Sequence, residues 1–64
     1  MKMEEMQNII KGVLEKHDSL NKNELILKAM TNRYFIKRKE VEEAIENLIK
    51  FKEVKIEDNK YMLI

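Results

Sequence analysis

The spacing of apolar residues changes once along this chain, close to Phe51, and that change limits the fold more than any other feature. Before Phe51 the apolar residues recur every three or four positions, as they do on one face of a helix. From residue 54 they alternate with charged residues, and Asp58 and Asn59 then supply the residue types of a tight turn. The pattern predicts helices followed by a β-hairpin whose last strand covers residues 61–64.

Three helices are expected before the hairpin. The first covers residues 2–16 and carries one apolar stripe. The second begins after Asn21, because Asn21 can cap a helix and Glu24 stands three residues later, as in a capping box, and it runs to about Met30. The third covers residues 37–51 and has the clearest helical period. A short strand at residues 19–20 could pair with the hairpin.

This order of elements predicts the fold class α+β, and within it a winged helix. The second and third helices form a helix-turn-helix, and the terminal hairpin is the wing. Residues 1–64 form one domain, because so short a chain holds one core and nothing in it marks a linker. The expected core consists of Ile9, Ile10, Val13, Leu14, Leu25, Val41, Ile45, Leu48, Val54 and Ile56.

Other residues have two interpretations. Met6, Met30 and Met62 fall on predicted core faces, although methionines also suit an adaptable binding surface. Gly12 lies within the first helix, either because another backbone approaches it closely or because it is a tolerated surface glycine. The aromatic residues that we expect to close the core are Tyr34, Phe35 and Phe51.

The composition argues against an enzyme. With no cysteine and a single histidine the chain lacks the usual zinc ligands, and one glycine cannot build a phosphate-binding loop. His17, Asp18 and Ser19 are the residue types of a hydrolase triad, but three consecutive residues cannot form its relay. We therefore predict no catalytic residue, cofactor, metal or small-molecule substrate. No apolar run suggests a signal peptide or a membrane segment, so we expect an intracellular protein of the nucleus or cytoplasm.

The third helix separates two classes of binding partner. It opens with Lys37, Arg38 and Lys39, which would suit the phosphates and base edges of DNA. Farther along, its exposed face carries three carboxylates, which DNA would repel, and the formal net charge of the chain is only +1. These carboxylates belong to Glu42, Glu43 and Glu46. We therefore predict a protein-binding winged helix; the alternative is a small DNA-binding transcription regulator that uses the three basic residues.

Residues 9–64 resemble the C-terminal winged-helix domain of cullins, the neddylation domain, and the cullin-like subunit of the anaphase-promoting complex. Three segments carry the likeness: residues 9–11 with His17, residues 23–25, and above all residues 41–54. The last segment is similar to the family's pattern of a helix that runs directly into a strand. Tyr61 stands where the family has a tyrosine in its final strand.

The resemblance implies a non-catalytic tail module of a ubiquitin-ligase scaffold, beside the RING-finger subunit and the ubiquitin-conjugating enzyme. It also implies a role for Lys11, which matches the lysine that accepts a ubiquitin-like modifier in cullins. The family's basic, methionine-containing stretch is replaced here at residues 9–14, which favours the cell-cycle (anaphase-promoting) type or a divergent cullin. Met1 would then begin a fragment of a longer scaffold. We predict a partner-binding surface at Arg33, Lys37, Arg38 and Lys39.

Overall fold

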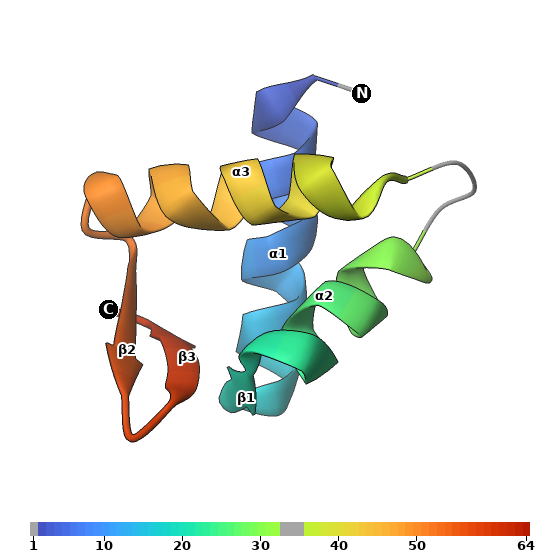
Figure 1. The fold of residues 1–64 in the computed structure, drawn as a ribbon. Coiled ribbons are helices and arrows are strands. Elements are labelled where there is room, and N and C mark those ends of the chain that lie inside the picture. Colours follow the sequence, from blue (N-terminus) through green and yellow to red (C-terminus); the bar gives the residue numbers. More distant parts are fainter. Residues whose placement is uncertain (1, 33–35) are drawn as a thin grey trace.

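A computed structural model describes residues 2–32 and 36–64 of the chain and confirms the predicted α+β fold class. Its helices and strands form a winged-helix arrangement (Figure 1). In chain order they are α1 (Met3–His17), β1 (Ser19–Asn21), α2 (Lys22–Met30), α3 (Arg38–Lys50), β2 (Val54–Glu57) and β3 (Lys60–Leu63). The helix limits agree with the sequence prediction to within one residue at each end.

The start of α2 is set by its cap. The Asn21 side chain accepts a hydrogen bond from the Glu24 N–H at 2.8 Å, and the Glu24 carboxylate accepts one from the Asn21 N–H at 3.4 Å. This reciprocal pair is the predicted capping box, and it satisfies main-chain donors that the first helical turn leaves without partners. Leu20 before the cap and Leu25 after it are both buried in the core.

The three strands form one antiparallel sheet in the order β1-β3-β2. The predicted strand after α1 therefore pairs with the hairpin, with Leu20 opposite Tyr61. Asp58 and Asn59 connect β2 to β3 with φ angles of 50° and 63°. Left-handed conformation at both central residues matches a type I′ turn, whose twist suits a two-residue hairpin loop.

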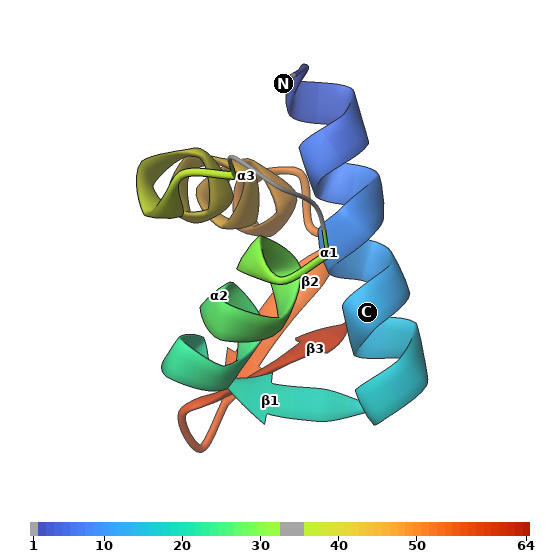
Figure 2. The ribbon, with the colours of Figure 1, turned by 90° about the vertical axis from the view of Figure 1, so that its right-hand side faces the viewer.

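The core lies between the three helices and the inner face of the sheet. In Figures 1 and 2, α3 crosses α1, while α2 and the sheet lie below α3. Eight of the ten predicted core residues are buried, and Ile9 is partly buried against the same cluster. Leu20, Ile26, Ala29, Ile36 and Ala44 also belong to the buried core.

Two residues expected in the core lie at the surface. The Ile56 side chain is 48% exposed, whereas that of Val54, two residues earlier on the same face of β2, is 2% exposed. The hairpin runs away from α3 (Figure 1), so α3 covers only its near end. Phe51 is 65% exposed because it follows the last helical residue, where the chain turns toward β2.

The methionines divide between the core and the surface. Met6 is buried, and Met30 is partly buried against the core. Met62 lies outside the core cluster, contrary to expectation. It alternates along β3 with Tyr61 and Leu63, which pack against the core, so its side chain lies on the opposite face of the sheet.

Gly12 is exposed, and a Cβ atom built there would meet nothing within 4 Å, so it is a surface glycine. The predicted contributions of Tyr34 and Phe35 to the core lie outside the described residues. Over residues 2–32 and 36–64, no helix has both the length and the apolar character needed to cross a membrane.

Candidate protein-binding surface

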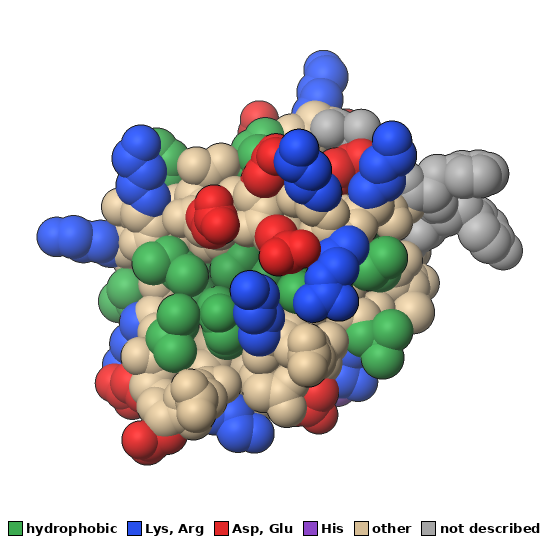
Figure 3. All heavy atoms as spheres, viewed as in Figure 1, with side chains coloured by type: hydrophobic (Ala, Val, Ile, Leu, Met, Phe, Trp, Pro, Cys, Tyr) green, Lys and Arg blue, Asp and Glu red, His purple; other side chains and the backbone are tan. Residues whose placement is uncertain are grey.

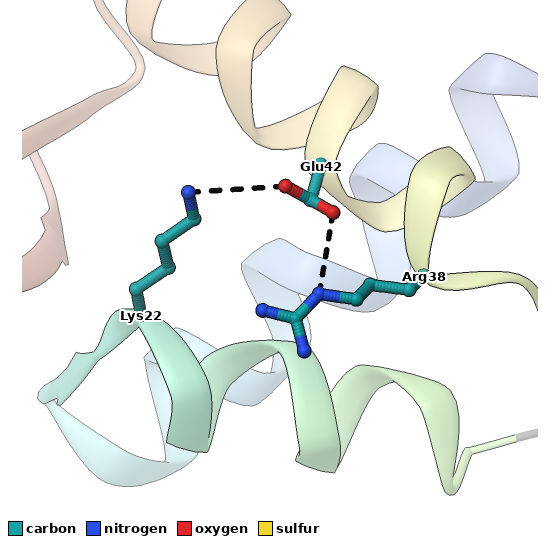
Figure 4. Close-up of polar contacts among 3 residues, drawn as sticks. All are labelled: Lys22, Arg38 and Glu42. Atoms are coloured by element: carbon teal, nitrogen blue, oxygen red, sulfur yellow. Dashed lines mark hydrogen bonds and ion pairs between the residues drawn. The ribbon is translucent and has the colours of Figure 1, made fainter.

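A small ion-pair network occupies the entrance of α3. The Arg38 Nε donates to the Glu42 Oε1 at 3.3 Å, one helical turn along α3. The other carboxylate oxygen of Glu42 lies 3.8 Å from the Lys22 Nζ, on the first residue of α2 (Figure 4). One carboxylate thus pairs with cations from two helices and links α2 to α3.

This network divides the predicted basic surface. Lys37 is the N-cap of α3, and both Lys37 and Lys39 are exposed, with no ion pair to another described residue. Arg38 lies between them in sequence, but its guanidinium is turned along the helix toward Glu42. Arg33, the fourth predicted residue, lies outside the described residues.

The rest of the exposed face of α3 is acidic along its middle. Glu43 and Glu46 are exposed on this helix, and Glu42 is half-buried. Figure 3 shows acidic side chains over the middle of α3. The positions expected to face DNA in a winged helix therefore carry negative charge, as predicted from the sequence.

Lys11 lies elsewhere on the molecule. Its Nζ is 2.9 Å from the Glu53 Oε1, which joins α1 to the segment between α3 and β2. The Lys11 side chain is 31% exposed. Arg38 begins α3 and Glu53 follows its end, so the candidate acceptor and the basic entrance are separated by a helix roughly 20 Å long.

An apolar surface lies between α3 and the hairpin. Hydrophobic side chains gather there in Figure 3. Ile56 is 48% exposed on β2, and Tyr61 stands opposite it on β3. Both are on the face of the sheet that carries the buried Val54. Contiguous apolar surface of this kind is a common feature of protein contact sites.

An open groove of about 550 Å³ runs along α1 beside the end of α2. Gly12 leaves it wide, because no side chain fills the space above the helix there. Three basic residues line it: Lys16 and His17 on α1, and Lys28 on α2. Among the residues that the structure describes, no three histidine, cysteine or acidic side chains are grouped to hold a metal ion.

Some of these features could have been predicted and others could not. The spacing of Arg38 and Glu42 by four residues on a predicted helix indicates an ion pair. The additional partner Lys22 and the pair of Lys11 with Glu53 depend on how the helices pack, for which the sequence contains no local signal. The groove beside Gly12 likewise depends on the position of α2.

Comparisons with protein-family models, with curated proteins and with solved structures found no match to this chain. The α3 entrance, the acidic face of α3 and the apolar surface beside the hairpin are the features that bear on a binding partner.

Proposed function

We propose that this domain is a non-catalytic protein-binding module of the winged-helix type. Its docking surface comprises the entrance of α3, with Lys37 and Lys39, and the apolar surface next to the hairpin. A DNA-binding winged helix places the face of its third helix against base edges and phosphates. Here the same face is better suited to a protein partner.

The observation that carries this proposal is the position of Glu42. DNA would require the cations of Lys22 and Arg38 to face phosphates, but both are already paired with this carboxylate, which offsets one of their two positive charges. Glu43 and Glu46 add two exposed negative charges on the same helix. Phosphate contacts supply most of the affinity of non-specific DNA binding, so this face lacks its main source of affinity.

The narrower form of the proposal follows from the resemblance to cullin tails. The domain would be the tail module of a cullin-type ubiquitin-ligase scaffold, and it would help to position the RING-finger subunit and the ubiquitin-conjugating enzyme. A tethered module needs only a weak contact, because the tether raises its effective concentration near its partner. Lys11 is the candidate acceptor of a ubiquitin-like modifier in this setting.

DNA affinity provides the first test. At physiological salt the wild-type chain should bind duplex DNA no better than the non-specific range of about 10⁻⁴–10⁻⁶ M, without sequence preference. The triple variant Glu42→Gln/Glu43→Gln/Glu46→Gln should bind DNA about tenfold more tightly, because it removes the repulsion and frees Lys22 and Arg38. Fluorescence anisotropy with a labelled random duplex measures both affinities.

A matched variant distinguishes the effect of the α3 carboxylates on DNA affinity from the effect of the net charge of the chain. Glu4→Gln/Glu15→Gln/Asp18→Asn removes three exposed negative charges from α1 and its C-cap. We expect this variant to gain much less affinity for DNA than the α3 variant. Equal gains in the two variants would contradict the proposal. So would tight binding of the wild-type chain to one duplex that is lost in Arg38→Ala, because the chain would then be a DNA-binding regulator.

Ubiquitin transfer tests the narrower form. In the parent ligase, deletion of this segment should lower both recruitment of the conjugating enzyme and the rate of transfer. Lys37→Glu/Lys39→Glu in the intact ligase should have the same effect if the entrance of α3 makes the contact, whereas Lys28→Glu/Lys60→Glu serves as the control of equal charge. Unchanged recruitment and transfer after deletion would rule out the docking role.

A further inference from the structure

The outer edge of β2 is open. β2 is at one end of the sheet order β1-β3-β2 and lies at the outer side of the sheet in Figure 1. The Ile64 N–H donates to the Glu53 carbonyl at 3.1 Å, so these two residues form a hydrogen-bonded pair. This pair shows which residues of β2 bond to β3. Main-chain groups alternate in direction along an antiparallel strand, so those of Lys55 and Glu57 face β3 while those of Val54 and Ile56 face outward. No described strand lies beside these outward groups.

The side chains of this edge complement themselves. Lys55 and Glu57 lie on the outer face of the sheet, where their side chains form an ion pair at 3.1 Å. Ile56 lies between them on the inner face and is 48% exposed. If a second copy of the strand is aligned antiparallel with Ile56 opposite Ile56, Lys55 of each copy stands opposite Glu57 of the other.

We propose that two copies of the chain associate through their β2 edges, paired antiparallel about a two-fold axis at Ile56. The outward N–H and C=O groups of Ile56 then bond to those of Ile56 in the second copy. Lys55 of each copy lies opposite Glu57 of the other, and the two exposed isoleucines cover each other. The inference does not depend on the proposed function.

Other registers are less favourable. Centring the pair on Lys55 opposes two lysines, and centring it on Glu57 opposes two glutamates, which costs energy at directly opposite positions. Centring it on Val54 would require Lys55 to meet Glu53, which already pairs with Lys11 at 2.9 Å. A register of odd offset would place outward main-chain groups opposite inward ones.

The occupant is a second copy because the edge contains its own complement. A lysine in an edge strand usually discourages pairing with another strand, and here Glu57 offsets that effect. The edge is only four residues long, so the contact buries less than the roughly 800 Å² per partner of a standard interface. The dimer is therefore weak and reversible.

Charge reversal provides the test. Sedimentation equilibrium of the wild-type chain, up to about 1 mM, should show an average mass that rises from that of one chain toward that of two. Lys55→Glu or Glu57→Lys alone should weaken self-association about tenfold, because each converts two opposite cross-strand pairs to repulsion. Both side chains are 45% or more exposed, so neither change should affect folding, and far-ultraviolet circular dichroism checks this.

Two experiments that should restore self-association identify the register of the paired β2 strands. The double variant Lys55→Glu/Glu57→Lys should associate as the wild type does, and an equimolar mixture of the two single variants should form mixed dimers. Lys50→Glu, on the exposed side of α3, is the control of equal charge change and should leave association unaltered. Protection of the Ile56 amide from hydrogen exchange should increase with concentration.

Several outcomes would overturn the inference. If the wild-type chain remains monomeric throughout the concentration range, its β2 edge does not pair with that of a second copy. A dimer that is insensitive to the single charge reversals, or that is not restored by the double variant, uses another surface or register. Lack of concentration-dependent protection at Ile56 would have the same meaning.

Discussion

Leu48 lies on α3, has no exposed surface and belongs to the buried core. Truncating it leaves a cavity as well as removing apolar contacts, and such changes cost about 2–5 kcal/mol. We therefore expect Leu48→Ala to lower the free energy of unfolding by that amount, measured by urea denaturation. A domain of this size is only modestly stable, so the variant should be largely unfolded at physiological temperature.

Leu27 is the control for this substitution. It lies on α2 and is 64% exposed, so Leu27→Ala should change the free energy of unfolding by no more than about 0.5 kcal/mol. Equal losses in the two variants would show that the core does not centre on α3.

The ion pair of Lys11 affects its role as an acceptor. The Lys11 amine must leave its ion pair to reach the thioester of a modifier, and the Glu53 carboxylate lies 2.9 Å from its Nζ. A partly exposed pair of this kind is worth up to about 1 kcal/mol, or roughly fivefold in equilibrium. In a reconstituted conjugation reaction we expect Glu53→Gln to raise the yield of conjugate by up to about that factor. Lys11→Arg should abolish the shifted band and Lys16→Arg should retain it; a band that persists in Lys11→Arg places the modification elsewhere.

At the scale of elements, the backbone conformation at the end of α3 lowers the stability of the domain. The Lys52 N–H bonds to the Ile49 carbonyl at 3.0 Å, and the Glu53 N–H bonds to the Leu48 carbonyl at 2.8 Å. This is the hydrogen-bond pattern of a Schellman motif, which places Lys52 in the left-handed region, at φ 61°. A side chain there costs about 1–2 kcal/mol, a cost that glycine largely avoids.

Lys52→Gly should therefore stabilise the domain by roughly 1 kcal/mol, which thermal denaturation can measure. Lys50→Gly, two residues earlier inside the helix, should destabilise it by about 1 kcal/mol. Glycine there loses more backbone entropy on folding, and no left-handed conformation is relieved. Loss of stability in Lys52→Gly would contradict the assigned backbone conformation at the end of α3.

Elements with a local signal could be predicted from the sequence. The capping box at Asn21 set the start of α2, and the change of period after Phe51 set the hairpin. The exposure of Ile56 and Phe51 could not be predicted, because periodicity indicates which face a residue occupies but not where the neighbouring helix stops. The motif at Lys52 was missed because it lacks the glycine by which such helix ends are recognised.

At the scale of the whole molecule, the charge pattern of α3 was predictable and its partners were not. The positions of Glu43 and Glu46 on the exposed face follow from helical geometry alone. Two other features follow from tertiary packing. Lys22 on α2 shares Glu42 with Arg38, and Lys11 on α1 pairs with Glu53, which lies beyond the C-terminal end of α3. The proposal that the domain binds protein combines both kinds of observation.

The most direct test of this claim follows the amide resonances of the isotopically labelled chain during titration. One sample receives a RING-finger subunit together with its ubiquitin-conjugating enzyme, and the other receives random duplex DNA at physiological salt. We predict saturable shifts centred on Lys37, Lys39 and Ile56 with the protein partners, and only weak, diffuse shifts with DNA. Saturable shifts along α3 with DNA, and none with the protein partners, would contradict the claim.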